Sequence, residues 1–458
     1  MFYRKDAVFM AVASLLAANG FAMADSTAPK TSLSLDPTVI TADAATDRAP
    51  LMWGLDKVGA AKPLDDLKLN IYGWVEAGYT YNHRHHSTPG ASSAGVPNSA
   101  IVPGPFNNEV GNHFMLNQVD LRFERLVDTT KFDVGGLVEV LYGNDAGFTH
   151  SSGLGFNGND PSDDNSPADS VADKYRTGNY QFDLLQAYVT INLPVGTGLQ
   201  LTVGKFVTLL GYETIDPRGN PFYSHSYSFN ALPFTQTGVL ATYQVTDAFK
   251  VIAGFTRGWD QSLEDNVAGN GKCALDGLGQ FSYTVNKQIT AMVNWSVGPQ
   301  TGGDTSHYRT AINPIITYQV TDAFKLGLEG IYISDGGLNQ TAGSGITHAY
   351  GDVWGGVLYA SYMVNDYVTV NGRFEKYHTS TANIGAVAAP DGGSLNVYSV
   401  TLGTTITPLP KDPLGKNISV RPEVRYDFSD SASNPPFNAG GRFFKDQLTF
   451  AADVIVKF

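Results

Sequence analysis

The stretch ISVRPEVRYDFSD, residues 418–430, decides the fold class of this protein. Its even-numbered positions are apolar: Ile418, Val420, Pro422, Val424, Tyr426 and Phe428. Its odd-numbered positions are polar or charged: Ser419, Arg421, Glu423, Arg425 and Asp427. Alternation with a period of two indicates a β-strand with one apolar and one polar face. Such a strand either covers the core of a soluble sheet or lies in a membrane barrel, with lipid outside and water inside.

The same alternation recurs along the chain, for example at 67–82, 117–124 and 448–458, while no helical periodicity is sustained in the mature chain. Extending the pattern predicts about sixteen strands. They are expected near 67–82, 113–126, 131–143, 180–193, 199–210, 235–245, 248–259, 275–285, 287–297, 308–320, 323–334, 350–364, 367–378, 394–407, 417–429 and 446–458.

The connections between these strands alternate between long and short. The repeat YQVTDAFKV at 243–251 and YQVTDAFKL at 318–326 combines a strand end, a tight turn and the next strand. Long connections are expected at 83–112, 144–179, 211–234, 260–274, 298–307, 335–349, 379–393 and 430–445. This order predicts an all-β fold, a transmembrane antiparallel barrel with short periplasmic turns and long extracellular loops over residues 67–458. Closure is required because lipid cannot hydrogen-bond an open strand edge.

Composition and charge agree with that class. Charged residues make up 16% of the 458-residue chain, against roughly 25% in soluble domains. The formal net charge of −13 argues against nucleic acid as a partner. No run of 18 or more apolar residues follows the N-terminus, which argues against helical membrane spans. The chain has one cysteine, Cys273, so no intramolecular disulfide is expected.

The N-terminus has the features of a secretory signal. Arg4 and Lys5 precede a short apolar stretch, and Ala22 and Ala24 frame an A-x-A cleavage site. We therefore predict a signal peptide at 1–24. Residues 25–66 are expected to form a flexible periplasmic extension, in which the apolar residues at 51–55 offer a docking surface at or inside the barrel mouth.

Three segments carry a family resemblance: GKFVTLLGYE at 204–213, NPFYSHSYSFNALPFTQTGVLATYQVTD at 220–247 and VRPEVRYD at 420–427. In these the chain resembles the OmpL-like putative β-barrel porin-2 family of bacterial outer-membrane proteins. The resemblance implies a barrel with channel function in the outer membrane of a Gram-negative bacterium. It carries over no catalytic residue and no cofactor. The terminal Phe458, on an alternating strand, resembles the signal that the outer-membrane barrel assembly machinery reads.

A barrel of this size encloses a water-filled channel, whose wall selects solutes by size and charge. By topological analogy with general porins, loop 211–234 is expected to fold inward and constrict the channel. The charged candidates for the pore wall and the constriction are Asp120, Arg122, Glu124, Glu213, Asp216, Arg218, Arg373, Glu375, Arg421, Glu423, Arg425 and Asp427. An alternative for each is pairing with a neighbour that only stiffens the wall.

Aromatic residues flank the short turns, where a periplasmic interface girdle is expected. They are Tyr243, Phe249, Tyr318, Phe324, Tyr362 and Tyr367. The function predicted on this basis is a porin for passive diffusion of ions and small polar solutes. Expected partners are these solutes, outer-membrane lipid and lipopolysaccharide, the assembly machinery and, by analogy, two further copies in a homotrimer.

Two other functions stay open: a plugged barrel acting as an adhesin or surface-structural protein, and a lipid hydrolase using a pair such as Ser224 and His225. No metal or cofactor is predicted. The histidines of HRHH at 83–86 are interpreted as a polar loop tip. The aspartates of 160–173 are interpreted as a solvated loop, with a Ca²⁺ site as the alternative.

Overall fold

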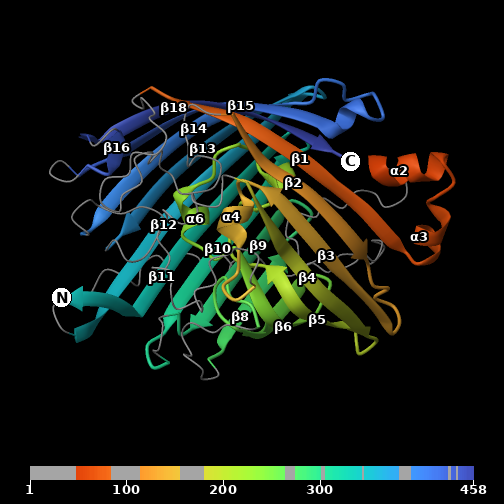
Figure 1. Ribbon diagram of the computed structural model, residues 1–458, viewed down its shortest axis with the longest axis horizontal. Coiled ribbons are helices and arrows are strands. Elements are labelled where there is room, and N and C mark those ends of the chain that lie inside the picture. Colours follow the sequence, from red (N-terminus) through yellow and green to blue (C-terminus); the bar gives the residue numbers. More distant parts are fainter. Residues whose placement is uncertain are drawn as a thin grey trace. The chain divides into compact units, whose positions relative to one another are not determined.

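The computed structural model describes residues 48–83, 114–154, 180–263, 274–300, 305–342, 345–380, 393–431, 435–439 and 442–458. Sixteen antiparallel strands close into one barrel, as the alternation predicted. Figure 1 shows the first strand, β1, in orange beside the blue strands of the C-terminal part. The barrel strands are β1 Leu69–Asn82, β2 Phe114–Arg125, β3 Asp133–Gly143, β4 Gln181–Leu193, β5 Leu199–Val207, β6 Thr235–Gln244, β7 Phe249–Thr256, β8 Asp276–Thr284, β9 Ile289–Gly298, β10 Arg309–Thr321, β11 Phe324–Ala342, β12 Gly345–Asn365, β13 Val368–Thr379, β14 Leu395–Ile406, β15 Ile418–Ser429 and β18 Asp446–Lys457.

The barrel closes between β1 and β18, which pair from Trp74–Lys457 to Asn82–Thr449. Beyond this ladder, Gly73 and Phe458 exchange two backbone hydrogen bonds of 2.9 Å. A side chain at Gly73 would clash first with the Asp120 carbonyl oxygen and also with the Phe458 ring, whose Cζ would lie 2.9 Å from an added Cβ. The last residue of the chain thus takes part in closing the barrel.

Two of the predicted loops are partly strand. Residues 335–349 were expected to be a long loop, but β11 and β12 continue as a hairpin to Ala342 and Gly345. The polar, glycine-containing sequence of this segment lacks the alternation by which the other strands were predicted. Within 430–445, β16 Phe437–Ala439 and β17 Arg442–Phe444 form a separate two-stranded sheet.

The described part of the segment before the barrel, residues 48–66, differs from the expectation of a flexible extension. It forms two helices, α2 Pro50–Lys57 and α3 Lys62–Asp66, each with proline in its first turn, a position that proline favours. Both helices contact β1, and Met52 is buried. None of the helices among the described residues has the length and apolar composition needed to cross a membrane. The predicted signal peptide at 1–24 lies outside the described residues.

Side chains alternate across the barrel wall as the sequence indicated. In β13, Asn371, Arg373 and Glu375 are buried on the inner face, while Val370 and Phe374 are exposed on the outer face. Most exposed large apolar residues of the strands lie on the outer face, which is the face that contacts hydrocarbon in a membrane barrel.

Candidate functional site

The segment between β5 and β6, residues 208–234, crosses the interior of the barrel. The segment begins at the end of β5 and ends at the start of β6, which are neighbours in the barrel wall. It nevertheless hydrogen-bonds to strands elsewhere around the barrel. Its wall partners are Asn117 and Gln118 of β2, Asn313 of β10, Glu329 of β11, Asn371, Arg373 and Glu375 of β13, and Arg421, Glu423 and Arg425 of β15. These contacts confirm the inward fold; the role of the loop as a constriction stays a prediction.

Short local structures give the loop its shape. The Asp216 carboxylate accepts a hydrogen bond from Arg218 N at 3.0 Å and caps the 3-10 turn η1 Pro217–Gly219. Ser226 Oγ accepts from Phe229 N at 3.0 Å and caps the helical turn α6 Tyr227–Asn230. Asp and Ser are preferred at such positions because their oxygens accept from otherwise unpaired N–H groups.

Two wall carboxylates hold pairs of consecutive backbone N–H groups of the loop. Glu375 accepts from Tyr227 N and Ser228 N, both at 2.8 Å, and from Ser228 Oγ at 2.7 Å. Glu423 accepts from Tyr223 N at 2.9 Å and Ser224 N at 3.1 Å. Hydrogen bonds to ionised acceptors are stronger than neutral ones, so these carboxylates fix both the position and the direction of the loop.

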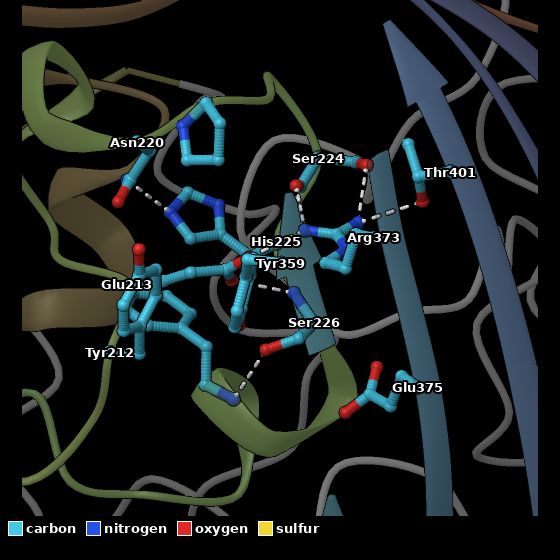
Figure 2. Close-up of polar contacts among 12 residues, drawn as sticks. Tyr212, Glu213, Asn220, Ser224, His225, Ser226, Tyr359, Arg373, Glu375 and Thr401 are labelled. Carbon is cyan, nitrogen blue, oxygen red and sulfur yellow. Dashed lines mark hydrogen bonds and ion pairs between the residues drawn. The ribbon is translucent and has the colours of Figure 1, made fainter. Parts of the chain in front are cut away.

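Three wall arginines also bind the loop, through positive charges instead of negative ones. Arg373 pairs with Glu213 at 2.6 Å and also binds Ser224, and Figure 2 shows its guanidinium between Ser224 and Thr401. Arg421 donates to the carbonyl oxygens of Pro217 and Asn220, both at 2.8 Å. These side chains are buried, and buried cations persist only where carboxylates and carbonyls satisfy them.

Arg425 completes the set. It donates to the carbonyl oxygen of His225 at 2.6 Å and to Asp427 at 2.8 Å. Arg421, on the same strand, also binds Glu76 and Asp453 of the neighbouring wall. The charged face of β15 that the sequence revealed therefore binds the loop and closes a network with β1 and β18.

Glycines of the wall make room for aromatic rings of the loop. A Cβ atom on Gly78 would lie 2.5 Å from Tyr223 Cζ, and one on Gly327 would lie 2.7 Å from Tyr212 Cζ. Both distances are far below van der Waals contact. Gly78 and Gly327 therefore act as sockets that only glycine can supply without displacing the loop.

The other side of the loop packs on an apolar interior surface, which differs from the expected charged and wet lumen. Inward-facing Leu240, Ile252, Leu278, Ile331, Ile333, Val353, Tyr377, Leu395 and Val397 of β6 to β14 form one buried cluster with Phe206, Leu209, Leu210, Tyr227 and Leu232 of β5 and the loop. The expectation is wrong for this sector because the loop brings its own apolar side chains inside, where burial removes them from water. The loop is thus held by charge on one side and by apolar packing on the other.

Burial also sets the protonation of groups on the loop. It lowers the pKa of His225 to about 4, because the charged imidazolium loses hydration. His225 is therefore neutral at pH 7, stacked on Phe229 with ring centroids 4.1 Å apart. Burial alone would raise the pKa of Glu213, but the neighbouring Arg373 guanidinium, His225 and the hydrogen bond from Ser226 N together lower that pKa below its ordinary value. Glu213 is therefore ionised at neutral pH.

Residues 68–458 match the family model described as "Putative beta-barrel porin-2, OmpL-like". The chain belongs to this porin family. It is an outer-membrane channel of a Gram-negative bacterium through which solutes diffuse. A comparison with curated proteins finds no match.

Solved structures share the fold of this porin. It is similar to the outer-membrane channel DcaP of Acinetobacter baumannii, with 13% identity over 85% of this chain and 97% of that one and a TM-score of 0.50. It is also similar to an anion-selective porin from Comamonas acidovorans, with 12% identity, coverage of 85% and 99%, and a TM-score of 0.51. Salmonella typhi OmpF in complex with daunomycin gives 12% identity, coverage of 85% and 97%, and a TM-score of 0.51.

The structure places the twelve predicted pore residues in one connected interior. Ten are buried, and the exceptions are Glu124, which accepts from Tyr72 Oη at 2.7 Å, and Arg218, whose side chain is 24% exposed. Arg122 binds Glu139 at 2.9 Å and lies 3.5 Å from Asp216 of the loop. Asp120 lies 3.7 Å from Arg122. The arrangement agrees with the pairing alternative, while a part in selecting solutes stays a prediction.

Sequence reasoning missed two wall residues that hold the beginning of the loop. Asn313 accepts from Gly211 N at 2.8 Å, and Glu329 accepts from Tyr212 N at 3.0 Å. On the inward face, Asn313 lies between Ala311 and Ile315 of β10, and Glu329 lies between Gly327 and Ile331 of β11. A polar residue between small or apolar neighbours of the same face was the available signal.

The six predicted girdle aromatics lie beside the short turns of the porin. Tyr243, Phe249, Tyr318, Phe324 and Tyr362 occupy outward positions, and Tyr367 is an exposed turn residue. Phe324 and Tyr362 contact each other edge to face, with centroids 6.3 Å apart. Their contact with the membrane interface stays a prediction.

The groups considered for other chemistry give no assembled site within the described ranges. Ser224 Oγ bonds to Arg373 and Arg425, whereas the His225 ring faces Thr214, Asn220 and Phe229. In the described parts of the chain, no three His, Cys, Asp or Glu side chains gather as metal ligands. The Asp-rich segment 160–173 and all of HRHH except His83 lie outside the described residues.

Proposed function

We propose that loop 211–234 is the constriction of a water-filled channel through which ions and small polar solutes diffuse passively. The observation that carries this proposal is the path of the loop across the barrel interior, bonded to β2, β10, β11, β13 and β15. A segment fixed at so many points reduces the open cross-section at a constant place. Solutes then pass according to size and to the charge beside the loop.

The buried charges act in this proposal as anchors of the loop. Arg373, Arg421 and Arg425 each bind at least one carboxylate and at least one carbonyl oxygen of the loop, so they hold the constriction in one geometry. The partly exposed Arg218 guanidinium lies 4.2 Å from the centre of the Trp74 ring and is the loop cation that a solute can reach. We assign Arg218 the first electrostatic contact with a permeating solute.

The chain acts, in this proposal, without catalysis. The Ser224 hydroxyl is hydrogen-bonded to Arg373 and Arg425. The His225 ring is directed to Thr214 and Asn220 instead of Ser224, so it is not placed as the base that a nucleophilic serine requires. We further propose assembly as a homotrimer in outer-membrane lipid and lipopolysaccharide. We expect Phe458 to be read by the barrel assembly machinery before it closes the barrel against Gly73.

Conductance of the purified porin in planar bilayers tests the channel proposal. Open-channel steps are expected, and polyethylene glycols of increasing size should stop reducing the conductance once they exceed the constriction. Insertion without any conductance would support the plugged barrel instead, an alternative that the apolar packing inside β6 to β14 favours. Hydrolysis of lipid that disappears in Ser224→Ala would support the enzyme.

A further inference from the structure

One cation lies on the lipid-facing side of a long part of the wall. By the alternation of inner and outer residues, Lys376 is the single Lys or Arg at an outward position in the described strands β6 to β15. Its strand neighbours Glu375 and Tyr377 are buried inside, and Phe374 on its own face is 47% exposed. Ionisable residues are rare on the lipid face of a barrel, so such a residue indicates a specific partner.

The position of Lys376 along β13 places it near the outer surface of the membrane. It lies three residues before Thr379, where β13 ends at the long-connection side of the barrel. Trp354 of β12 and Tyr398 of β14 are its outward neighbours, and such aromatic residues mark membrane interfaces. A cation on the lipid face costs about 2–4 kcal/mol at the midplane but only about 0–1 kcal/mol near an interface. The position is therefore one where a charge is tolerated beside lipid headgroups.

Aromatic rings hold the ammonium group in place. Lys376 Nζ lies 4.9 Å from the centre of the Trp354 ring and 5.7 Å from that of Tyr398. Tyr398 is in turn stacked on Phe428 of β15, with centroids 5.1 Å apart. The rings support the cation from two sides. Among the described residues, Lys376 forms no ion pair.

Neighbouring polar groups extend this surface without neutralising it. The His378 ring stacks on Trp354 with centroids 5.0 Å apart, and its Nδ1 lies 2.9 Å from Asn396 Oδ1. Asp352 lies at the outer end of the same face of β12 and forms no ion pair with Lys376. The surface formed by Trp354, Lys376, His378 and Tyr398 is therefore a cationic spot on an aromatic band.

We propose that this surface binds a phosphate group of lipopolysaccharide in the outer leaflet. The outer leaflet of a Gram-negative bacterium presents phosphorylated glycolipid at this depth, and its charge complements Lys376. A second copy of the chain complements it less well, because its outer face offers few acids: in the described barrel strands from β6 to β18, only Asp352 and Asp446 are outward acids. The acyl chains would lie against the apolar outer face below, beside Phe374 and Leu402.

The test measures binding of lipid A with both phosphates, and of lipid A lacking them, to the delipidated full-length porin by native mass spectrometry. Lys376→Gln should weaken binding of the phosphorylated form about tenfold, the effect of losing one charge-assisted contact. Lys376→Arg should restore binding. Lys287→Gln is the matched control, because Lys287 is an exposed lysine at the short turn between β8 and β9, on the opposite side of the membrane.

Equal binding of both lipids, or equal binding by the wild type and Lys376→Gln, would overturn the proposal. Association between porin copies that Lys376→Gln abolishes, with lipid binding unchanged, would assign the surface to a protein contact instead and also overturn it. Conductance is measured in parallel and should be unchanged in Lys376→Gln. A silent wild-type channel would count against the proposed function and leave the lipid proposal standing.

Discussion

Replacing Glu375 with alanine should release the helical turn α6 from the wall. The Glu375 carboxylate, fully buried, accepts three hydrogen bonds from the loop: Tyr227 N, Ser228 N and Ser228 Oγ, at 2.8, 2.8 and 2.7 Å. Each bond to a charged acceptor contributes roughly 1.5–3 kcal/mol. Because such contributions are not additive and water can enter the new space, we expect a net loss of about 3–5 kcal/mol in the local stability of the turn.

Amide hydrogen exchange measures this loss directly. A loss of about 3–5 kcal/mol should speed exchange at Tyr227 and Ser228 by about 100- to 4,000-fold, since every 1.4 kcal/mol is a factor of about ten. Single-channel recordings should show larger and noisier conductance, because the loop no longer holds one position. Glu375→Gln keeps one acceptor oxygen and should give a smaller change in both measurements.

Asp335→Ala serves as the control for the loss of a buried inward acid. Asp335 pairs with Arg309 at 2.7 Å and does not bond to the loop, so its loss should lower overall stability and leave loop exchange unchanged. If Glu375→Ala exchanges like the wild type at Tyr227 and Ser228, the loop does not depend on this carboxylate. The anchoring role assigned to the wall charges would then be refuted.

Three further changes test other parts of the site. Gly327→Ala places a Cβ 2.7 Å from Tyr212 Cζ, and overpacking of this kind costs about 1–3 kcal/mol. The melting temperature should therefore fall, and a melting temperature equal to that of the wild type would rule out the socket. Arg421→Met leaves the buried Asp453 carboxylate without its guanidinium partner. The free energy of unfolding, measured with denaturant, should fall by about 3–5 kcal/mol. An unchanged free energy of unfolding would show that water replaces the cation. The folded-state pKa of His225, about 4, lies below the ordinary value of about 6.5. Its contribution to stability is therefore full above pH 6.5 and is lost as pH falls through about 4. The protection factors of the loop amides, which are corrected for the intrinsic pH dependence of exchange, should fall over that range in the wild type and less steeply in His225→Phe.

The amino-acid sequence by itself determined the barrel. Strand positions follow from an alternation that acts between adjacent residues, and the outer face is apolar because every strand meets the same lipid. The segment 418–430 shows this, since β15 spans Ile418–Ser429 with its charged residues inside. Loop lengths then fixed the order of turns, and the motifs at 204–213, 220–247 and 420–427 gave the family. Each of these signals lies within a short stretch of chain.

The tertiary structure alone decided what the interior charges do. Glu375 and Tyr227, or Arg421 and Pro217, are separated by 148 and 204 residues and meet only when the closed barrel surrounds the loop. The sequence showed that these residues face inward but not whether water or another segment would meet them. Their burial depends on the path of loop 208–234, which is set by many contacts with distant strands at once. Local periodicity carries no information about such contacts, so the charged face of β15 could be predicted while its partners could not.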